Sequence, residues 1–160
     1  MNAVNPWVPP AGLVPPPFYA PSARTGYSYM KPGVKLAQGS APPSRIVVPF
    51  DVIVLAAREY QDQPDLSAYF VIRAPLRDGP MPSVEERALI HATARDVANH
   101  VLAGKRVLVT CWQGRNRSGV IVGLALVELG LPRDQAITRV RGYRNGLTND
   151  YFRAMVAGML

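Results

Sequence analysis

The sequence predicts one α/β domain, a three-layer sandwich in which a mostly parallel central sheet carries helices on both faces. Short runs of β-branched and aliphatic residues, such as 52–55 and 106–110, alternate with longer segments whose apolar residues recur at helical spacing. The chain has 160 residues, 48% of them hydrophobic and 18% charged. This size and composition suit a single globular domain with a sizeable core.

The expected strands are short, and β-branched residues dominate them. The run at 106–110 is expected to be the central strand. In chain order, the strands begin at Leu36-Ala37 and cover Val52–Leu55, Tyr69–Arg73 and Arg106–Thr110, with a brief apolar run at Ile46–Pro49.

Four helices are expected, and they cover residues 83–103, 118–129, 132–143 and 148–159. Ser83 and Glu86 have the spacing of a capping box at the start of the first helix, and Gly104 ends it. The second helix is apolar on nearly every side, which predicts that it is buried. Pro132 is suited to the first position of the third helix, and Thr148 to the N-cap of the fourth.

The N-terminal segment differs from the rest of the chain, because 11 of the 16 prolines lie within residues 1–50. Proline lacks the backbone donor that helices and sheets require and favours an extended chain. We therefore expect residues 1–30 to form an extended or disordered arm and residues 31–160 to form the domain. Trp7, Phe18 and Tyr19 favour an arm that docks on its own domain or on a partner, but composition alone leaves a disordered tail equally open.

The net charge of +7 favours anionic substrates. Residues 1–50 hold four basic residues and no acidic one, whereas residues 51–160 hold 14 basic and 11 acidic residues. This distribution is too even to predict a dedicated nucleic-acid groove. Arg139, Arg141 and Arg144 form either a solvated face or a cluster from which Arg144 approaches the substrate.

The only cysteine is Cys111, which excludes an internal disulfide and indicates a reducing compartment. The longest apolar stretch, Val120–Val127, is too short to span a bilayer, and the N-terminus lacks the pattern of a secretory signal. We therefore expect a cytoplasmic protein with no membrane partner. His91 and His100 have no companion at metal-ligand spacing, so neither a metal nor a cofactor is expected.

The most informative segment runs from Cys111 to Ser118. A strand ends at Cys111, a short loop containing Gly114 follows, and an apolar helix begins near Arg117 and Ser118. Backbone N–H groups converge at such a helix N-terminus and form a cradle for an anion. The loop residues expected to supply these groups, with side chains that mostly point outward, are Trp112, Gln113, Gly114, Arg115 and Asn116.

The residue types in this loop indicate phosphoryl transfer through a phosphocysteine. Cys111 is the expected nucleophile, because the cradle favours its thiolate. Arg117 offers a planar fork for two phosphate oxygens. Gly114 permits the turn and lets the backbone approach the anion. Ser118 is expected both to donate a hydrogen bond to the Cys111 sulfur and to cap the helix.

This Cys-x5-Arg-Ser pattern resembles the signature of the protein tyrosine and dual-specificity phosphatases, and the resemblance extends over about residues 34–159. Lys35–Ser40 looks like the family's opening strand and its Gly-Ser turn. Ala74–Asp78 looks like its general-acid loop, and Arg144–Phe152 like its closing helix. The short length favours the dual-specificity branch. The resemblance implies the family's sandwich fold and hydrolysis of phosphotyrosine or phosphoserine/threonine in proteins or peptides.

Asp78 is the expected general acid, because a leaving alkoxide or phenoxide needs a proton. It follows the strand Tyr69–Arg73 and precedes Cys111 by 33 residues, which matches the family layout. Asp-Gly-Pro is also a common turn sequence, so a purely structural role stays open. Asp62 and Asp65 are weaker candidates, because they lie before that strand.

One position departs from the family pattern. Thr110 stands where the family usually has a histidine that orients the loop and acidifies the thiol. We therefore expect a less acidic Cys111 than in members with the histidine. The Thr110 hydroxyl could replace part of this function by a hydrogen bond within the loop.

Two other functions remain open at this point. Gly114–Gly119 resembles the Gly-x-Asn-Arg-Thr/Ser-Gly run of the cysteine-dependent RNA triphosphatases, which makes RNA with a 5′-phosphate or triphosphate the alternative substrate. Inositol phosphates are a further substrate class. A catalytically silent adaptor would instead hold a phosphate in the loop without turnover and would interact through the Pro-rich arm.

Overall fold

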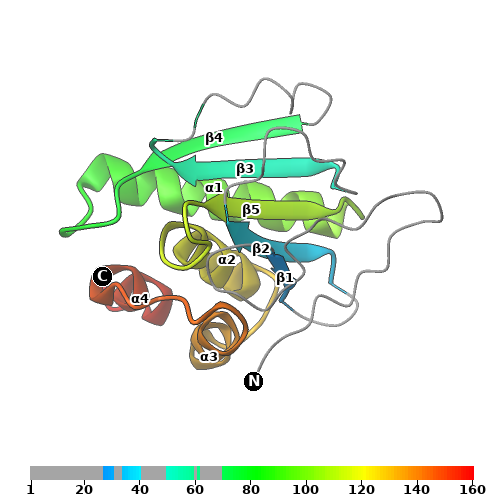
Figure 1. Cartoon of the computed structure of the whole chain (residues 1–160). Helices are drawn as coiled ribbons and strands as arrows, with labels where there is room; N and C mark the ends of the chain where they lie inside the picture. The colour runs from blue at the N-terminus through cyan, green and yellow to red at the C-terminus, as the bar shows by residue number, and fades with distance from the viewer. Residues whose placement is uncertain (1–26, 31–33, 41–49, 60, 62–69) are drawn as a thin grey trace.

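The computed structural model describes residues 27–30, 34–40, 50–59, 61 and 70–160. These residues form a sheet in the order β1-β2-β5-β3-β4, seen from bottom to top in Figure 1. Strands β2, β5, β3 and β4 are parallel, and β1 pairs antiparallel with β2. The predicted α/β class, the mostly parallel sheet and the central position of β5 are confirmed. The strands are β1 Tyr27–Tyr29, β2 Leu36–Ser40, β3 Val52–Ala57, β4 Phe70–Leu76 and β5 Val107–Cys111.

The β1–β2 edge of the sheet differs from the expectation. Tyr27–Tyr29, which the composition assigned to the arm, pairs with β2 as an edge strand. The expected Gly-Ser turn is wrong, because Gly39 and Ser40 continue β2 and pair with Thr110 and Cys111 of β5. Extending β2 in this way keeps it beside the full length of β5. Residues 1–26 and the run 46–49 lie outside the described residues.

The described helices are α1 Val84–Leu102, α2 Arg117–Glu128, α3 Arg133–Arg144 and α4 Asp150–Ala157. The capping box of Ser83 and Glu86 is present as predicted. Pro132 is the N-cap of α3, directly before its first residue. The N-cap of α4 is Asn149 rather than Thr148, because the Asn149 side chain accepts hydrogen bonds from the amides of Tyr151 and Phe152.

The helices of the described residues all lie on one face of the sheet. Helices α1 and α2 pack on the sheet and on each other, and α3 and α4 pack against α2 (Figure 1). They share one hydrophobic core with alternate residues of the strands, such as Val54 and Val109. Every residue from Arg117 to Leu126 in α2 is buried, so α2 needs cover on all sides and gathers the other helices around it. The prediction of helices on both faces is therefore not met within the described residues.

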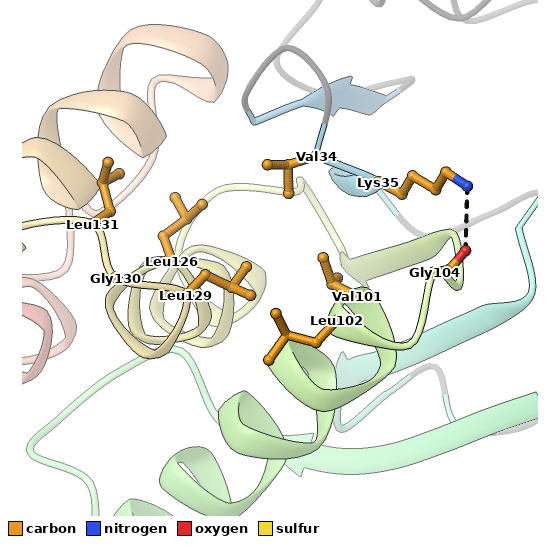
Figure 2. Close-up of a pocket in the computed structure, with 9 residues that line it drawn as sticks. All are labelled: Val34, Lys35, Val101, Leu102, Gly104, Leu126, Leu129, Gly130 and Leu131. Atoms are coloured by element: carbon orange, nitrogen blue, oxygen red, sulfur yellow. Dashed lines mark hydrogen bonds between the residues drawn. The ribbon is translucent and has the colours of Figure 1, made fainter.

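The two ends of the parallel strands differ in character. At their amino-terminal ends, an apolar groove of about 400 Å³ lies between the start of β2 and the ends of α1 and α2 (Figure 2). Aliphatic side chains such as Val34, Leu102 and Leu129 line it, and Lys35 Nζ donates to Gly104 O at 3.3 Å. Cys111 ends β5 at the opposite, carboxyl-terminal edge. That edge is where α/β sheets place their ligands.

None of the helices in the described ranges is both long enough and apolar enough to cross a bilayer.

Candidate active site

The site is built on the connection between the last residue of β5 and the first residue of α2. The Cys111 side chain is nearly covered, with 3% of the residue exposed. Its Sγ lies 3.2 Å from Ser118 Oγ, a hydrogen-bond distance for a sulfur. Ser118 is the second residue of α2, and Asn116 occupies the N-cap position. The expected capping role of Ser118 is therefore wrong, because α2 begins before it and the hydroxyl faces the sulfur.

Three carbonyl groups of the loop, those of residues 113–115, accept hydrogen bonds from the side chains of Gln38 and Arg144. Gln38 Nε2 donates to Gly114 O at 3.0 Å and to Arg115 O at 3.4 Å. Arg144 donates to Gly114 O and to Gln113 O, each at 3.3 Å. In a trans peptide the C=O and N–H bonds point in opposite directions. The amide groups that follow these carbonyls therefore face the other side of the loop.

Those amide groups are free to bind a ligand. Among the described residues, nothing accepts a hydrogen bond from the backbone N–H groups of residues 113–118. They lie at the N-terminus of α2, where the helix dipole adds positive potential. The Asn116 side chain does not cap α2, so the first backbone N–H groups of this helix stay available. Free donors at a helix N-terminus are suited to an anion such as phosphate.

Gly114 is required by the geometry of the loop. Its φ is +65°, a conformation that other residues rarely adopt. A Cβ atom there would lie 2.4 Å from the carbonyl carbon of Gly39 and 2.7 Å from Arg144 Nη2. The loop therefore packs directly on the β2 backbone, which leaves no space for a side chain.

Arg117 is buried beside the loop and is held by two segments from the same sheet edge. Its Nη1 and Nη2 donate to the Glu59 carboxylate at 2.6 and 2.7 Å, and Nη1 also donates to Leu76 O at 3.2 Å. Burial opposes the charge, but Glu59, with Cys111 and Asp78, keeps the pKa of Arg117 above its usual value. In turn, the Arg117 guanidinium lowers the pKa of Glu59. Arg117 is thus a fixed cation at this edge.

Arg144 is a second buried cation, located behind the loop rather than on a solvated face or on the substrate side. It is 4% exposed and binds the loop carbonyls described above. Burial lowers the pKa of Arg144 to about 10, and the charge of Cys111 opposes this effect. Its neighbours in the sequence do lie at the surface: Arg141 is exposed, and Arg139 lies over the Tyr143 ring at 5.6 Å.

Thr110 does not contribute to the loop. Its buried hydroxyl donates to Val54 O in β3 at 2.8 Å. Successive residues of a strand point to opposite faces, so Thr110 points away from the face that carries Cys111. The expected hydrogen bond within the loop is therefore not formed, and the hydroxyl instead ties β5 to β3.

Asp78 lies just after β4, at the mouth of the site. With Arg58, Glu59, Arg77 and Arg117 it lines an open cavity of about 480 Å³. Its carboxylate is exposed, and the Asp-Gly-Pro segment forms a bend. The turn and the general acid are thus compatible roles for the same residue. The two weaker candidates, Asp62 and Asp65, lie outside the described residues.

The loop side chains follow the expectation with one exception. Trp112 and Gln113 are exposed, and Arg115 is half-buried. The expected outward direction is wrong for Asn116, whose side chain donates to Asp78 Oδ2 at 3.1 Å. It turns inward because its Oδ1 accepts hydrogen bonds from the start of the α4 region.

The two histidines, His91 and His100, both lie in α1. The His100 ring packs against Phe70 at a centroid distance of 5.3 Å, and His91 is half-buried in α1. The parts of the chain that the structure describes contain no group of three or more His, Cys, Asp or Glu side chains that could hold a metal ion.

Three supporting residues escaped the sequence analysis: Gln38, Glu59 and Asn149. Gln38 is fully buried and donates to Ser118 Oγ at 3.1 Å as well as to the loop carbonyls. A glutamine inside a buried strand is an unusual polar residue and could have been noticed. Glu59 follows the carboxyl end of a predicted strand, which is also a signal. Asn149 could not be distinguished from an ordinary helix cap.

No protein-family model matches the chain, and no curated protein matches it by sequence. Its structure is similar to that of human DUSP28, with 24% identity and a TM-score of 0.69 over 93% of this chain and 96% of that one. It is also similar to Tk-PTP in its active form, with 23% identity and a TM-score of 0.68 over 83% and 95% of the two chains.

A third similar structure is OH1 from the Orf virus, a tyrosine phosphatase with triple substrate specificity. It shows 18% identity and a TM-score of 0.64 over 86% of this chain and 88% of OH1. The chain therefore has the fold of the dual-specificity and tyrosine phosphatases, as the resemblance of its sequence implied.

Proposed function

We propose that this chain is a cysteine-dependent phosphatase that hydrolyses phosphotyrosine, phosphoserine or phosphothreonine in proteins. One observation carries the proposal: free loop amides and the buried Arg117 surround a cysteine whose sulfur lies 3.2 Å from a hydroxyl. Such an arrangement provides a nucleophile, an anion site and a donor to the leaving sulfur together. The fold adds support, because the similar solved structures are phosphatases.

The first step forms a phosphocysteine. The Cys111 thiolate attacks phosphorus, a P–S bond forms, and the P–O bond to the substrate breaks. Asp78 transfers its proton to the departing oxygen. Arg117 and the loop amides bind the equatorial oxygens, where charge is spread in the transition state.

The second step releases phosphate and restores the enzyme. Asp78, now ionised, accepts a proton from a water molecule, which attacks phosphorus as the P–S bond breaks. The sulfur leaves as a thiolate and accepts a hydrogen bond from Ser118 Oγ. The 3.2 Å separation of these two atoms supports this role.

The mouth of the site favours acidic substrates. Three arginines line the cavity, Arg58, Arg77 and Arg117, against two carboxylates, Glu59 and Asp78. Trp112, beside the nucleophile, is 44% exposed. An exposed aromatic ring can contact a peptide next to its phosphorylated residue. The single cysteine, which can form no internal disulfide, supports a cytoplasmic location.

RNA 5′-phosphatase activity is the second candidate. It is favoured by the loop sequence Gly114–Gly119 and by the arginines of the mouth, which would also suit a polyphosphate. A catalytically silent adaptor is the third candidate, but it would have no use for Cys111, Arg117 and Asp78 together.

The test is phosphate release from phosphopeptides, inositol phosphates and 5′-triphosphate RNA, with Cys111→Ser and Asp78→Asn as variants. We expect turnover of phosphopeptides, near-complete loss in Cys111→Ser, and a loss in Asp78→Asn that grows with the basicity of the leaving group. Preference for triphosphate RNA would favour the second candidate. Binding of phosphopeptide without release by the wild type would favour the adaptor.

A further inference from the structure

We infer that Asn116 and Asn149 are positioning residues that clamp the carboxylate of Asp78 onto the phosphate loop. The inference deepens the proposed function, because it rests on Asp78 as the general acid. Asn116 is the loop residue whose side chain turns inward instead of outward, and the clamp gives that side chain a role.

Each oxygen of the Asp78 carboxylate accepts a hydrogen bond from a side-chain amide. Asn116 Nδ2 donates to Oδ2 at 3.1 Å, and Asn149 Nδ2 donates to Oδ1 at 3.0 Å. The second amide also donates to Gly79 O at 3.1 Å. Asp78 is exposed and lies in a bend, so its side chain would otherwise be free to rotate. Two donors from different segments select one orientation of the carboxylate.

The direction of the Asn116 amide is determined by its oxygen. Asn116 Oδ1 accepts from the backbone N–H of Thr148 at 2.8 Å, from Thr148 Oγ1 at 3.1 Å and from the backbone N–H of Asn149 at 3.1 Å. Backbone N–H groups can only donate, so this atom must be the oxygen. The nitrogen therefore faces Asp78, and no flipped arrangement satisfies the same partners.

The Asn149 side-chain amide is also oriented by its oxygen, which caps α4. Its Oδ1 accepts from the amides of Tyr151 at 3.0 Å and Phe152 at 3.3 Å, as the N-cap of α4. The nitrogen is left to face Asp78 and Gly79. The start of α4, the phosphate loop and the bend after β4 are thus joined through two asparagine side chains.

This arrangement holds the Asp78 carboxylate at a fixed position relative to the bound phosphate. Asn116 directly precedes Arg117 in the loop, so Asp78 is tied to the backbone next to the cation that binds the substrate. Each carboxyl oxygen has a second lone pair, so the clamp leaves a position for the proton that Asp78 transfers. Neutral amides orient the group without adding a charge beside it.

Two substitutions remove the donors and keep the other hydrogen bonds. Asn116→Asp retains an oxygen for the Thr148 and Asn149 amides but places a carboxylate where the donor was. Asn149→Ser retains a residue that caps helices well and lacks the Nδ2 donor. Asn99→Asp is the matched control, because Asn99 is an exposed asparagine of α1. Its neighbour His100 packs on Phe70, the first residue of β4, whereas Asp78 follows the last residue of that strand.

The measurement is kcat/KM for phenyl phosphate, a poor leaving group, and for 4-nitrophenyl phosphate, a good one. We expect Asn149→Ser to lose roughly tenfold or more on phenyl phosphate and less than about threefold on 4-nitrophenyl phosphate. Asn116→Asp also adds a carboxylate that repels phosphate, so it should lower kcat/KM for both substrates, with a loss on phenyl phosphate that is again larger by about threefold or more. In Asn149→Ser, the inhibition constant of inorganic phosphate and the melting temperature should stay close to the wild-type values. Asn99→Asp should match the wild type on both substrates.

Combination with Asp78→Asn separates positioning from a general structural role. Once the acid is absent, Asn149→Ser should cause no further loss on phenyl phosphate. An equal loss on both substrates, or a full additional loss in the double variant, would overturn the clamp. If Asp78→Asn alone shows no dependence on the leaving group, the acid assignment and the clamp both fail. The loss of turnover in Cys111→Ser would still test the proposed function by itself.

Discussion

The Glu59 carboxylate binds both terminal nitrogens of Arg117, at 2.6 and 2.7 Å, and so decides which edge of the guanidinium remains available. A guanidinium has five N–H donors. Glu59 and Leu76 O use three of them. The remaining two are on Nε and Nη2, and the buried Nε has no partner among the described residues. These neighbouring donors form one edge, which suits two oxygens of a phosphate.

We therefore predict that Glu59→Ala weakens phosphate binding, although it removes a negative charge from the site. Without the carboxylate, the guanidinium can rotate and its free edge is no longer aligned. The inhibition constant of inorganic phosphate should rise about tenfold, which corresponds to about 1.4 kcal/mol.

The control is Asp51→Asn, which weakens a comparable pair, Asp51–Arg106, at the opposite edge of the sheet. It should leave the inhibition constant unchanged. Tighter phosphate binding by Glu59→Ala would show that Glu59 competes with phosphate rather than orienting Arg117.

Replacement of Gly114 by alanine should abolish turnover. The new Cβ would lie 2.4 Å from the Gly39 backbone, so the loop must move away from β2 and its amides lose their common direction. We expect at least a hundredfold loss of kcat/KM and a loss of about 1–3 kcal/mol in unfolding free energy. Gly104→Ala is the matched control, because Gly104 also has a positive φ of +82° but meets nothing within 4 Å. It should lose stability and retain turnover; equal turnover in both variants would contradict the prediction.

Arg144→Met should weaken the support of the loop carbonyl groups. The substitution removes the donors to Gln113 O and Gly114 O, and with them a buried positive charge near Cys111. We predict a loss of kcat/KM of about a hundredfold and slower alkylation of Cys111 by iodoacetamide at a fixed pH. Arg95→Met, at an exposed position of α1, should change neither rate. An unchanged alkylation rate in Arg144→Met would rule out an influence of Arg144 on the nucleophile.

Because of the capping box of α1, part of the unfolding free energy should depend on pH in the acidic range. A hydrogen bond from Arg77, with one from the Ser83 amide, lowers the pKa of Glu86 from 4.5 to about 2. A carboxyl whose pKa is lower in the folded state stabilises the fold above its unfolded value, and this contribution is lost as the pH falls. The unfolding free energy should thus decrease between pH 4.5 and about 2.

Urea unfolding of Glu86→Gln measures this contribution. The variant should be less stable by about 1 kcal/mol at pH 7 and should lack the Glu86 part of the decrease in acid. Glu85→Gln, at the exposed neighbouring position, should behave as the wild type. A parallel pH profile for Glu86→Gln and wild type would contradict the assignment.

The elements of the fold could be predicted because their signals are local. The alternation of strands and helices, the central position of β5 and the capping box of Ser83 and Glu86 follow from residues close together in the sequence. Errors of one residue occurred at helix starts, where Thr148 and Asn149 are both good caps and only the packing selects between them. The distribution of helices over the two faces depends on packing around α2, so periodicity could not supply it.

The α/β class and the loop from Cys111 to Ser118 could be derived from local residues, because these eight are consecutive and their spacing encodes the turn and the helix start. What surrounds that loop follows from tertiary packing. Gln38, Glu59 and Arg144 come from segments 76, 58 and 30 residues away from their partners in the loop and α2. They meet because parallel strands bring their carboxyl ends to one edge and α2 is packed on all sides. The partners of a side chain at such an edge depend on which strands become neighbours, and no local pattern carries that information.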